Sequence, residues 1–227
     1  MTTRTLLSVL AAVFALVAVY SSRSPAPSIT KPFVRGRNNT ILFLSNDDLG
    51  LANAMVATSY ALLTKHSDLE IHYGTHRRFQ SPLSNVNEAA HDNKALSKPV
   101  TAHIFHGKDY EDSILELMTD PLEVYHKTGW WNLEGFLRTL TLALQPVEPE
   151  QYLSTFKQCL ALIEEIDPAV VVVEPLFSPG IDAVRMMRRR EVMLSPSALQ
   201  DTLGQFQPNG EVLWKYPAYV ARSPYDQ

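Results

Sequence analysis

The chain has 227 residues, of which 45% are hydrophobic and 19% are charged, and its net charge is −4. This composition is typical of a globular protein and supplies enough apolar residues for one well-buried core. The acidic balance argues against nucleic acid as a partner. The single cysteine, Cys159, excludes an internal disulfide and a multi-cysteine metal site, and we interpret it as a small buried apolar residue.

The first element in chain order is a charge-free apolar run at residues 5–20. As a helix it would span about 24 Å, slightly less than the roughly 30 Å of a bilayer core. It fits either a signal peptide or a signal anchor within residues 1–22, followed by a linker at 23–38. Basic residues after the run favour a cytosolic flank, whereas the glycosylation sequon at 38–40 is useful only in the lumen, so the orientation stays open. We expect a protein of the endoplasmic reticulum membrane or the secretory pathway, attached to the membrane through residues 5–20.

Residues 39–227 are predicted to form one α/β domain. Strands are predicted at the β-prone runs 40–44, 69–74, 100–105, 169–173 and 191–194. Helices are predicted by apolar spacing at 52–65, 110–118, 130–144, 149–166 and 179–187. The polar stretch 81–98 is expected to be irregular or weakly helical. This alternation predicts a Rossmann-like parallel sheet with helices on both faces.

Ligands of such sheets bind outside the carboxyl ends of the strands, which here selects the loops 45–53 and 174–180. Glu174 follows four valines, and a carboxylate at that position would serve either as the partner of a base or substrate hydroxyl, or as a solvated helix cap. Asp47 and Asp48 end the first strand, where they would serve as helix caps, metal ligands or catalytic groups.

His76 follows the second strand at the same edge, but no pattern in the sequence orients its side chain. The chain contains neither GxGxxG nor GxxxxGK[ST], so the dinucleotide and P-loop fingerprints are absent from the sequence.

Several unusual strings carry a resemblance to a known family. The stretch DPAVVVVEPLFSPGID at 167–182 resembles fungal family 1 glycosyltransferases, the UDP-glucosyl/glucuronosyltransferase-like enzymes. The likeness extends to MLSPSAL at 193–199, to QPNGEVLWKYPAY at 207–219 and to the opening strand, loop and helix at 41–63. It implies the N-terminal, acceptor-side half of a two-domain GT-B fold. The activity implied is transfer of a hexose from a UDP-sugar to a hydroxyl of a small lipophilic acceptor, without a metal.

In the family that the chain resembles, a histidine after the first strand acts as general base and an aspartate at a later strand end orients it. Here Leu49 stands at the histidine position and Glu174 at the aspartate position, and Asp48 is the neighbouring candidate for the base. The resemblance assigns Glu174 and Asp48 to catalysis. It assigns acceptor contacts to Asn46, Asp47, Leu49, Gly50, Asn53 and Phe177.

The resemblance also predicts what the chain would lack. We expect the nucleotide-sugar domain to be missing, because the chain ends roughly where the first domain of the family ends. A truncated or degenerate acceptor-side domain would be inactive alone, since the proximity of two substrates would be lost. We expect no metal and no cofactor, and a UDP-sugar only where a C-terminal domain is present. The expected partners are a small lipophilic acceptor and a separate donor domain.

Two alternatives remain open at this point. ILFLSNDDLGL resembles the opening of SurE-like metal-dependent phosphatases, in which adjacent aspartates, here Asp47 and Asp48, bind a divalent cation. The glycine-rich Ser/Asn loop of that family is not found in the sequence. The third reading is a non-catalytic, membrane-associated binding module with an exposed apolar patch.

Overall fold

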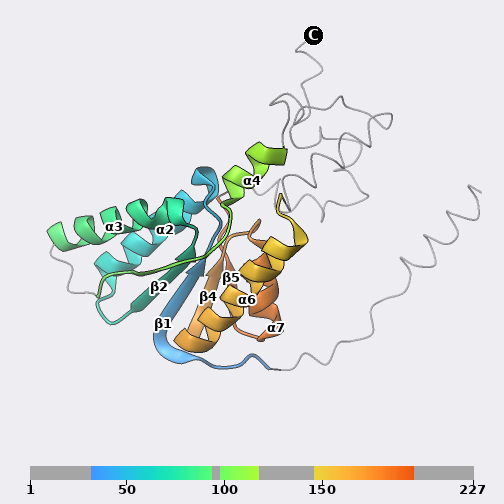
Figure 1. Ribbon diagram of the computed structural model, residues 1–227. Helices are drawn as coiled ribbons and strands as arrows, with labels where there is room; N and C mark the ends of the chain where they lie inside the picture. Colours follow the sequence, from blue (N-terminus) through green and yellow to red (C-terminus); the bar gives the residue numbers. More distant parts are fainter. Residues whose placement is uncertain (1–31, 94–97, 118–145, 197–227) are drawn as a thin grey trace, which may run out of the picture. The chain divides into compact units, whose positions relative to one another are not determined.

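The computed structural model describes residues 32–93, 98–117 and 146–196 (Figure 1). From Phe33 onward these residues belong to one compact unit, Phe33–Gln227. The apolar run at 5–20 and the helix predicted at 130–144 lie outside the described residues, so the membrane and localisation predictions stay predictions. In the described ranges, no helix combines the length and the apolar character that a bilayer crossing requires.

Five parallel strands form a single sheet in the order β3-β2-β1-β4-β5 (Figure 1). The strands are β1 (Arg37–Leu44), β2 (Glu70–Thr75), β3 (Thr101–Ile104), β4 (Pro168–Val173) and β5 (Glu191–Met193). The predicted α/β class and parallel sheet are therefore confirmed. Residues 42–44 of the central strand β1 are all fully buried, which explains why this strand reads as an uninterrupted apolar run.

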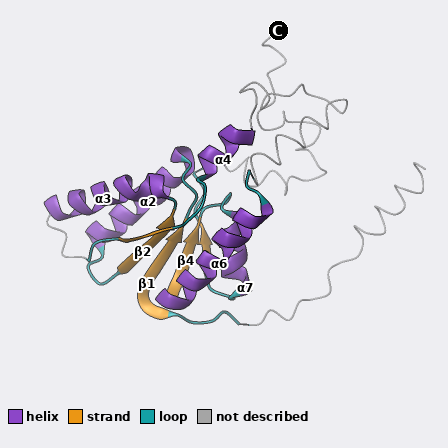
Figure 2. Cartoon of the chain, in the orientation of Figure 1, coloured by secondary structure: helices purple, strands orange, loops and turns teal. Residues whose placement is uncertain are grey.

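Helices cover both faces of the sheet (Figure 2). They are α2 (Leu49–Lys65), α3 (Gln80–Asp92), α4 (Tyr110–Leu117), α6 (Pro149–Ile166) and α7 (Ser178–Met186), with a short 3-10 turn η1 (Arg77–Phe79) before α3. Alternate side chains of β1 point into two separate cores. Phe43 packs with residues of α2 and α3, whereas Leu42 and Leu44 pack with residues of α6 and α7. Cys159 is fully buried in the second core, as the sequence predicted.

Of the two alternatives for residues 81–98, irregular or weakly helical, the helical one holds for the first part, which forms α3. Leu83, Val86 and Ala90 are buried at helical spacing and pack against the sheet. The side chain of Asn87 pins this helix to the start of β3, because it donates to the Val100 carbonyl at 3.0 Å and accepts from the Val100 amide at 2.7 Å. The apolar face of α3 is narrow, and most residues of the segment are polar, so the helical spacing is hard to detect in the sequence.

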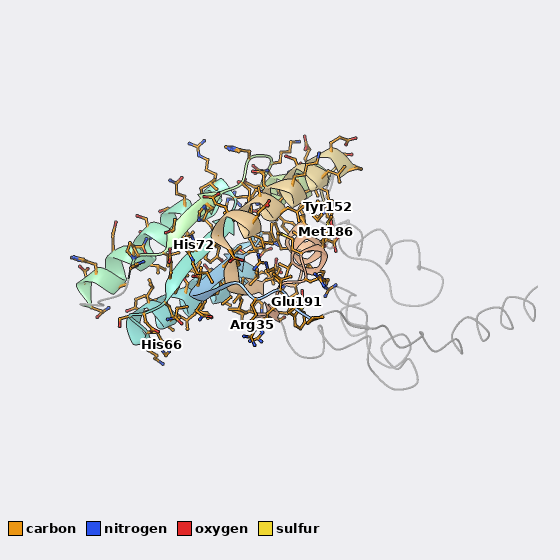
Figure 3. The ribbon with its side chains drawn as sticks, turned by 90° about the horizontal axis from the view of Figure 1, so that it is seen from below. Arg35, His66, His72, Tyr152, Met186 and Glu191 are labelled. Atoms are coloured by element: carbon orange, nitrogen blue, oxygen red, sulfur yellow. The ribbon has the colours of Figure 1, made fainter. Side chains whose placement is uncertain are left out.

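The helices of the second face are tied to each other and to the strands. Pro149 occupies the first turn of α6, as predicted, and the helix ends at Asp167 in the left-handed conformation (φ 53°). Tyr152 of α6, labelled in Figure 3, donates a hydrogen bond to Asp182 of α7. The buried Arg189 side chain forms an ion pair with Asp167 at 2.5 Å. These contacts join α6 to α7 and to the segment that follows α7.

Candidate functional site

The chain changes direction across the sheet at β1, and this determines where a ligand can bind. From β1 it proceeds through β2 to β3 on one side, and it later returns to β4 and β5 on the other. The loops that follow β1 and β4 therefore leave neighbouring strands in opposite directions. The resulting crevice at the carboxyl edge is the usual ligand site of open α/β sheets. Both loops selected from the sequence begin there.

Hydrogen bonds beyond the regular ladders fix the ends of three strands. The Ser45 amide donates to the Gly74 carbonyl at 3.2 Å, and the Glu174 amide donates to the Leu44 carbonyl at 3.1 Å. The Thr75 hydroxyl donates to the Asn46 carbonyl at 3.2 Å. The loops after β1, β2 and β4 are thus held in register, and side chains on them have defined positions.

A pocket opens at this edge between the strand ends and the start of α6. Its lining residues come from segments that are distant in the sequence: Asn46, His76, Lys108, Tyr110, Pro146, Val147, Gln151, Thr155, Leu176, Phe177 and Pro179. The walls are mostly carbon, and Asn46 and His76 supply polar atoms from the ends of β1 and β2. An apolar pocket with a few placed polar groups is the common form of a small-molecule site.

Several buried polar atoms at this edge have no hydrogen-bond partner among the described residues. They are Asn46 Nδ2, Asp47 Oδ2, both ring nitrogens of His76 and Glu174 Oε2. Leaving such an atom unpaired in the interior costs about 1–3 kcal/mol. Among these four residues, Asn46 and His76 line the pocket, whereas Asp47 and Glu174 do not.

His76 is the central member of this group. It is only 4% exposed, and its ring meets Phe105 and Phe177 edge-on at centroid distances of 5.8 and 6.4 Å. Burial lowers the pKa of His76, and the nearby charge of Asp47 partly opposes this shift. The ring is therefore neutral at pH 7, with one nitrogen that donates and one that accepts. The sequence placed His76 after the second predicted strand and gave no role to it, and that position was the clearest signal that its side chain could reach the pocket.

Glu174 lies fully buried at the end of β4. Its Oε1 accepts a hydrogen bond from the Leu176 amide at 2.7 Å. Burial raises the pKa of Glu174 to about 7, although the hydrogen bond from Leu176 acts in the opposite direction. This carboxyl is thus protonated in part of the molecules at neutral pH. It is not among the residues that line the pocket.

The two adjacent aspartates have different structural roles. Asp47 is fully buried, and its Oδ1 accepts from the Tyr110 amide at 2.7 Å, which joins the end of β1 to the start of α4. Asp48 Oδ1 accepts from the amides of Gly50 and Leu51 at 2.7 and 3.2 Å. Asp48 is therefore the N-cap of α2, in the arrangement that the helix start favours.

Replacing Asp48 with alanine is expected to lower the free energy of unfolding by about 1 kcal/mol, because two helix amides lose their acceptor. Asp48→Asn should cost far less, since its side-chain oxygen still caps the helix. Urea unfolding of both variants measures the difference. Equal losses in the two variants would contradict the capping role and direct attention to the carboxylate charge.

The remaining predicted acceptor contacts divide into two groups. Asn46 and Phe177 line the pocket, as a binding role requires. Leu49, Gly50 and Asn53 lie on the exposed first turns of α2 and are not among the pocket residues. Leu49 itself is 53% exposed. The roles of these residues stay predictions, and the described geometry brings only the first group to the pocket.

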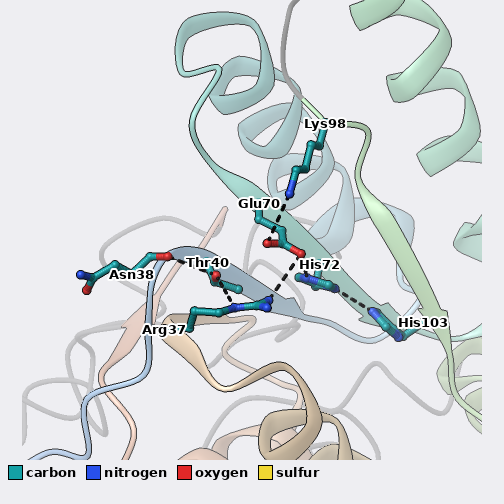
Figure 4. A network of polar contacts seen from close by, with 7 residues as sticks. All are labelled: Arg37, Asn38, Thr40, Glu70, His72, Lys98 and His103. Atoms are coloured by element: carbon teal, nitrogen blue, oxygen red, sulfur yellow. Dashed lines mark hydrogen bonds and ion pairs between the residues drawn. The ribbon is translucent and has the colours of Figure 1, made fainter.

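A second polar cluster lies nearer the amino ends of the strands (Figure 4). The carboxylate oxygens of Glu70 lie 3.4 Å from a side-chain nitrogen of Arg37, 3.8 Å from that of Lys98 and 3.3 Å from a ring nitrogen of His72. The other nitrogen of His72 lies 3.0 Å from a ring nitrogen of His103. These side chains satisfy one another across β1, β2 and β3, so we interpret this cluster as structural.

The phosphatase alternative gains no support from the residues around Asp47 and Asp48. Each of these two aspartates already binds a backbone amide through one oxygen. Within the ranges that the structure describes, no three His, Cys, Asp or Glu side chains are grouped as metal ligands would be.

No protein-family model matches the chain. Its sequence is 30% identical over 199 residues to "Glycosyltransferase sdnJ" of Sordaria araneosa, a match that covers 85% of this chain and 38% of the relative. Among solved structures, glycosyltransferase VinC in complex with DTDP matches with 16% identity and a TM-score of 0.45, covering 82% of this chain and 40% of that one. SnogD from Streptomyces nogalater matches with 16% identity and a TM-score of 0.37, covering 77% and 38%. The match to the Sordaria araneosa protein confirms the resemblance to glycosyltransferases that the sequence strings indicated.

Proposed function

We propose that this chain, whose sequence resembles a fungal glycosyltransferase, supplies the acceptor-binding half of such an enzyme. The reaction would transfer a hexose from a UDP-sugar to a hydroxyl of a small lipophilic acceptor. The chain spans 38% of the length of the glycosyltransferase that it matches. We therefore assign the nucleotide-sugar contacts to a part of the enzyme that lies outside the match.

The observation that carries this proposal is the pocket at the carboxyl edge of β1, β2 and β4. Its walls are mostly apolar, while the unpartnered ring of His76 and the side-chain nitrogen of Asn46 are among the lining residues. A molecule with an apolar body and one hydroxyl matches this distribution, because the body would cover carbon and the hydroxyl would pair the buried nitrogens. The described pocket residues offer no arginine and a single lysine, Lys108, which forms an ion pair with Glu116. A diphosphate group would therefore find little positive charge there.

Calorimetry on the full chain tests this assignment with three ligands. We expect heat of binding with the hydrophobic alcohol 2-naphthol, and none with UDP-glucose or with magnesium ions. Apolar burial should give the alcohol a negative heat-capacity change of binding. Binding of UDP-glucose without binding of the alcohol would overturn the acceptor-side assignment. Binding of magnesium that Asp47→Asn abolishes would instead favour the phosphatase.

A further inference from the structure

We propose that Asn38 carries an N-linked oligosaccharide, which it receives from a lipid diphosphate oligosaccharide in the lumen of the endoplasmic reticulum. The α/β domain that begins at this residue then faces the lumen. The inference does not depend on the proposed function, because the acceptor pocket lies at the opposite edge of the sheet.

The sequence contains one acceptor motif for this modification. Asn38-Asn39-Thr40 matches Asn-x-Ser/Thr, and none of the other asparagines of the chain has a serine or threonine two positions later. The apolar run at 5–20, predicted from the sequence to be a signal peptide or signal anchor, is the kind of segment that directs a chain to the lumen. Three-residue patterns also occur by chance, so the surroundings of each of the three residues matter.

The fold itself uses the second and third residues of the motif. Asn39 has a left-handed backbone (φ 59°), and its side chain donates to Asp68 at 3.2 Å. Thr40 is only 1% exposed and is the first residue of β1 that pairs with β2. Its hydroxyl accepts a hydrogen bond from Arg37 Nε at 3.2 Å. Asn39 and Thr40 therefore each have a structural role.

The side chain of Asn38 has no such role. Asn38 is exposed, and its side-chain amide forms no hydrogen bond with the described residues. Only its backbone carbonyl takes part, by accepting from the Thr40 hydroxyl at 3.4 Å. In Figure 4 the amide points away from the ion pairs of Glu70. An N-linked oligosaccharide is bulky and hydrated, so the amide that carries it has to point into solvent, as this one does.

The position of Asn38 along β1 leaves the pocket open. Asn38 lies near the amino end of this strand, and the pocket lies beyond its carboxyl end at Leu44. The part of the strand from Thr40 to Leu44 alone spans about 13 Å. An oligosaccharide on Asn38 therefore extends from the edge of the sheet that binds no acceptor.

The transfer step balances with the lipid diphosphate oligosaccharide as the second substrate of a host oligosaccharide transferase. The side-chain nitrogen of Asn38 forms a bond to the anomeric carbon of the oligosaccharide. The bond from that carbon to the lipid diphosphate breaks, and its electron pair leaves with the diphosphate. The nitrogen releases one proton to a base of the transferase and remains a neutral amide.

Expression of the full chain in yeast tests the modification directly. We expect the protein to migrate more slowly in a denaturing gel than the same protein treated with peptide N-glycosidase, by the equivalent of one oligosaccharide. The glycosidase leaves aspartate where the oligosaccharide was attached, so mass spectrometry of the treated protein should find aspartate at position 38.

Variants of the three motif residues separate the modification from other causes of a mobility shift. Asn38→Gln should abolish the shift and leave urea unfolding of the sugar-free protein unchanged, because this side chain is exposed. Thr40→Val should abolish the shift too, since the motif requires a hydroxyl. Asn39→Gly is the matched control and should keep the shift, because it leaves Asn-x-Thr intact and glycine adopts a positive φ without strain.

A parent protein whose mobility does not change on treatment would overturn both the modification and the lumenal location. A shift that persists in Asn38→Gln would overturn the assignment to Asn38. Loss of the shift in Asn39→Gly would also contradict it, since the motif is complete in that variant.

Discussion

Phe177→Ala is expected to lower the free energy of unfolding by about 3–5 kcal/mol and to abolish binding of hydrophobic alcohols. Phe177 is only 3% exposed and stacks on Phe105 with ring centroids 5.9 Å apart. It also lines the pocket and contacts the edge of the His76 ring. Its removal therefore leaves a cavity in the core and takes away one wall of the site.

The packing around Phe177 explains why the loss should be large. A Cβ atom added at Gly180 would lie 2.5 Å from a carbon of the Phe177 ring, so the ring fills its space closely. Urea unfolding and titration with 2-naphthol measure the two effects. Phe33→Ala is the matched control, because Phe33 is 63% exposed and its loss should change stability by less than about 0.5 kcal/mol. Unchanged alcohol binding in Phe177→Ala would place the acceptor elsewhere.

The second large effect is expected at Glu174 and depends on pH. Burial raises the pKa of this carboxyl from 4.5 to about 7, so the folded protein keeps a proton that the unfolded chain has already released. The stabilisation is complete below about 4.5 and is lost as the pH rises to about 7. The loss is on the order of 3 kcal/mol over this range.

Glu174→Gln removes this dependence, because glutamine stays neutral and can still accept from the Leu176 amide. The measurement is the difference in unfolding free energy between the parent protein and the variant at a series of pH values. Burial lowers the pKa of His76, which makes stability fall in the acid direction, and taking the difference removes that contribution. A difference that does not change across the range would show that Glu174 ionises normally.

Local patterns in the sequence were sufficient for most of the sheet. The runs at 40–44 and 169–173 are apolar without alternation, and both form inner strands with helices on each face. The segment of α3 was left between irregular and weakly helical, because three buried residues among many polar ones give a weak signal. The parallel direction of the strands followed from the alternation of strands and helices.

The site was harder to predict than the fold. The strand-end rule selected the loops at 45–53 and 174–180, and Asn46 and Phe177 within them line the pocket. The orientation of His76 depends on its contacts with Phe105 and Phe177, which are distant in the sequence. A short sequence pattern cannot predict such contacts. The capping role of Asp48 was one of the alternatives considered, and only the positions of the helix amides decide it.

The central position of β1 also governs how the molecule assembles. Ile41 pairs with Ile71 of β2, and only one helix separates these two strands in the sequence. Ile41 also pairs with Val170 of β4, and most of the domain's sequence lies between these two strands. Closing the longer loop costs more chain entropy, and non-local parallel pairing slows folding. Asn46 and His76 follow β1 and β2, the strand pair that can form early. Phe177 and Glu174 follow β4 and reach the site only when β4 pairs with β1. The pocket therefore exists only in the fully assembled protein, and any molecule that occupies it will shift the unfolding equilibrium toward the native state.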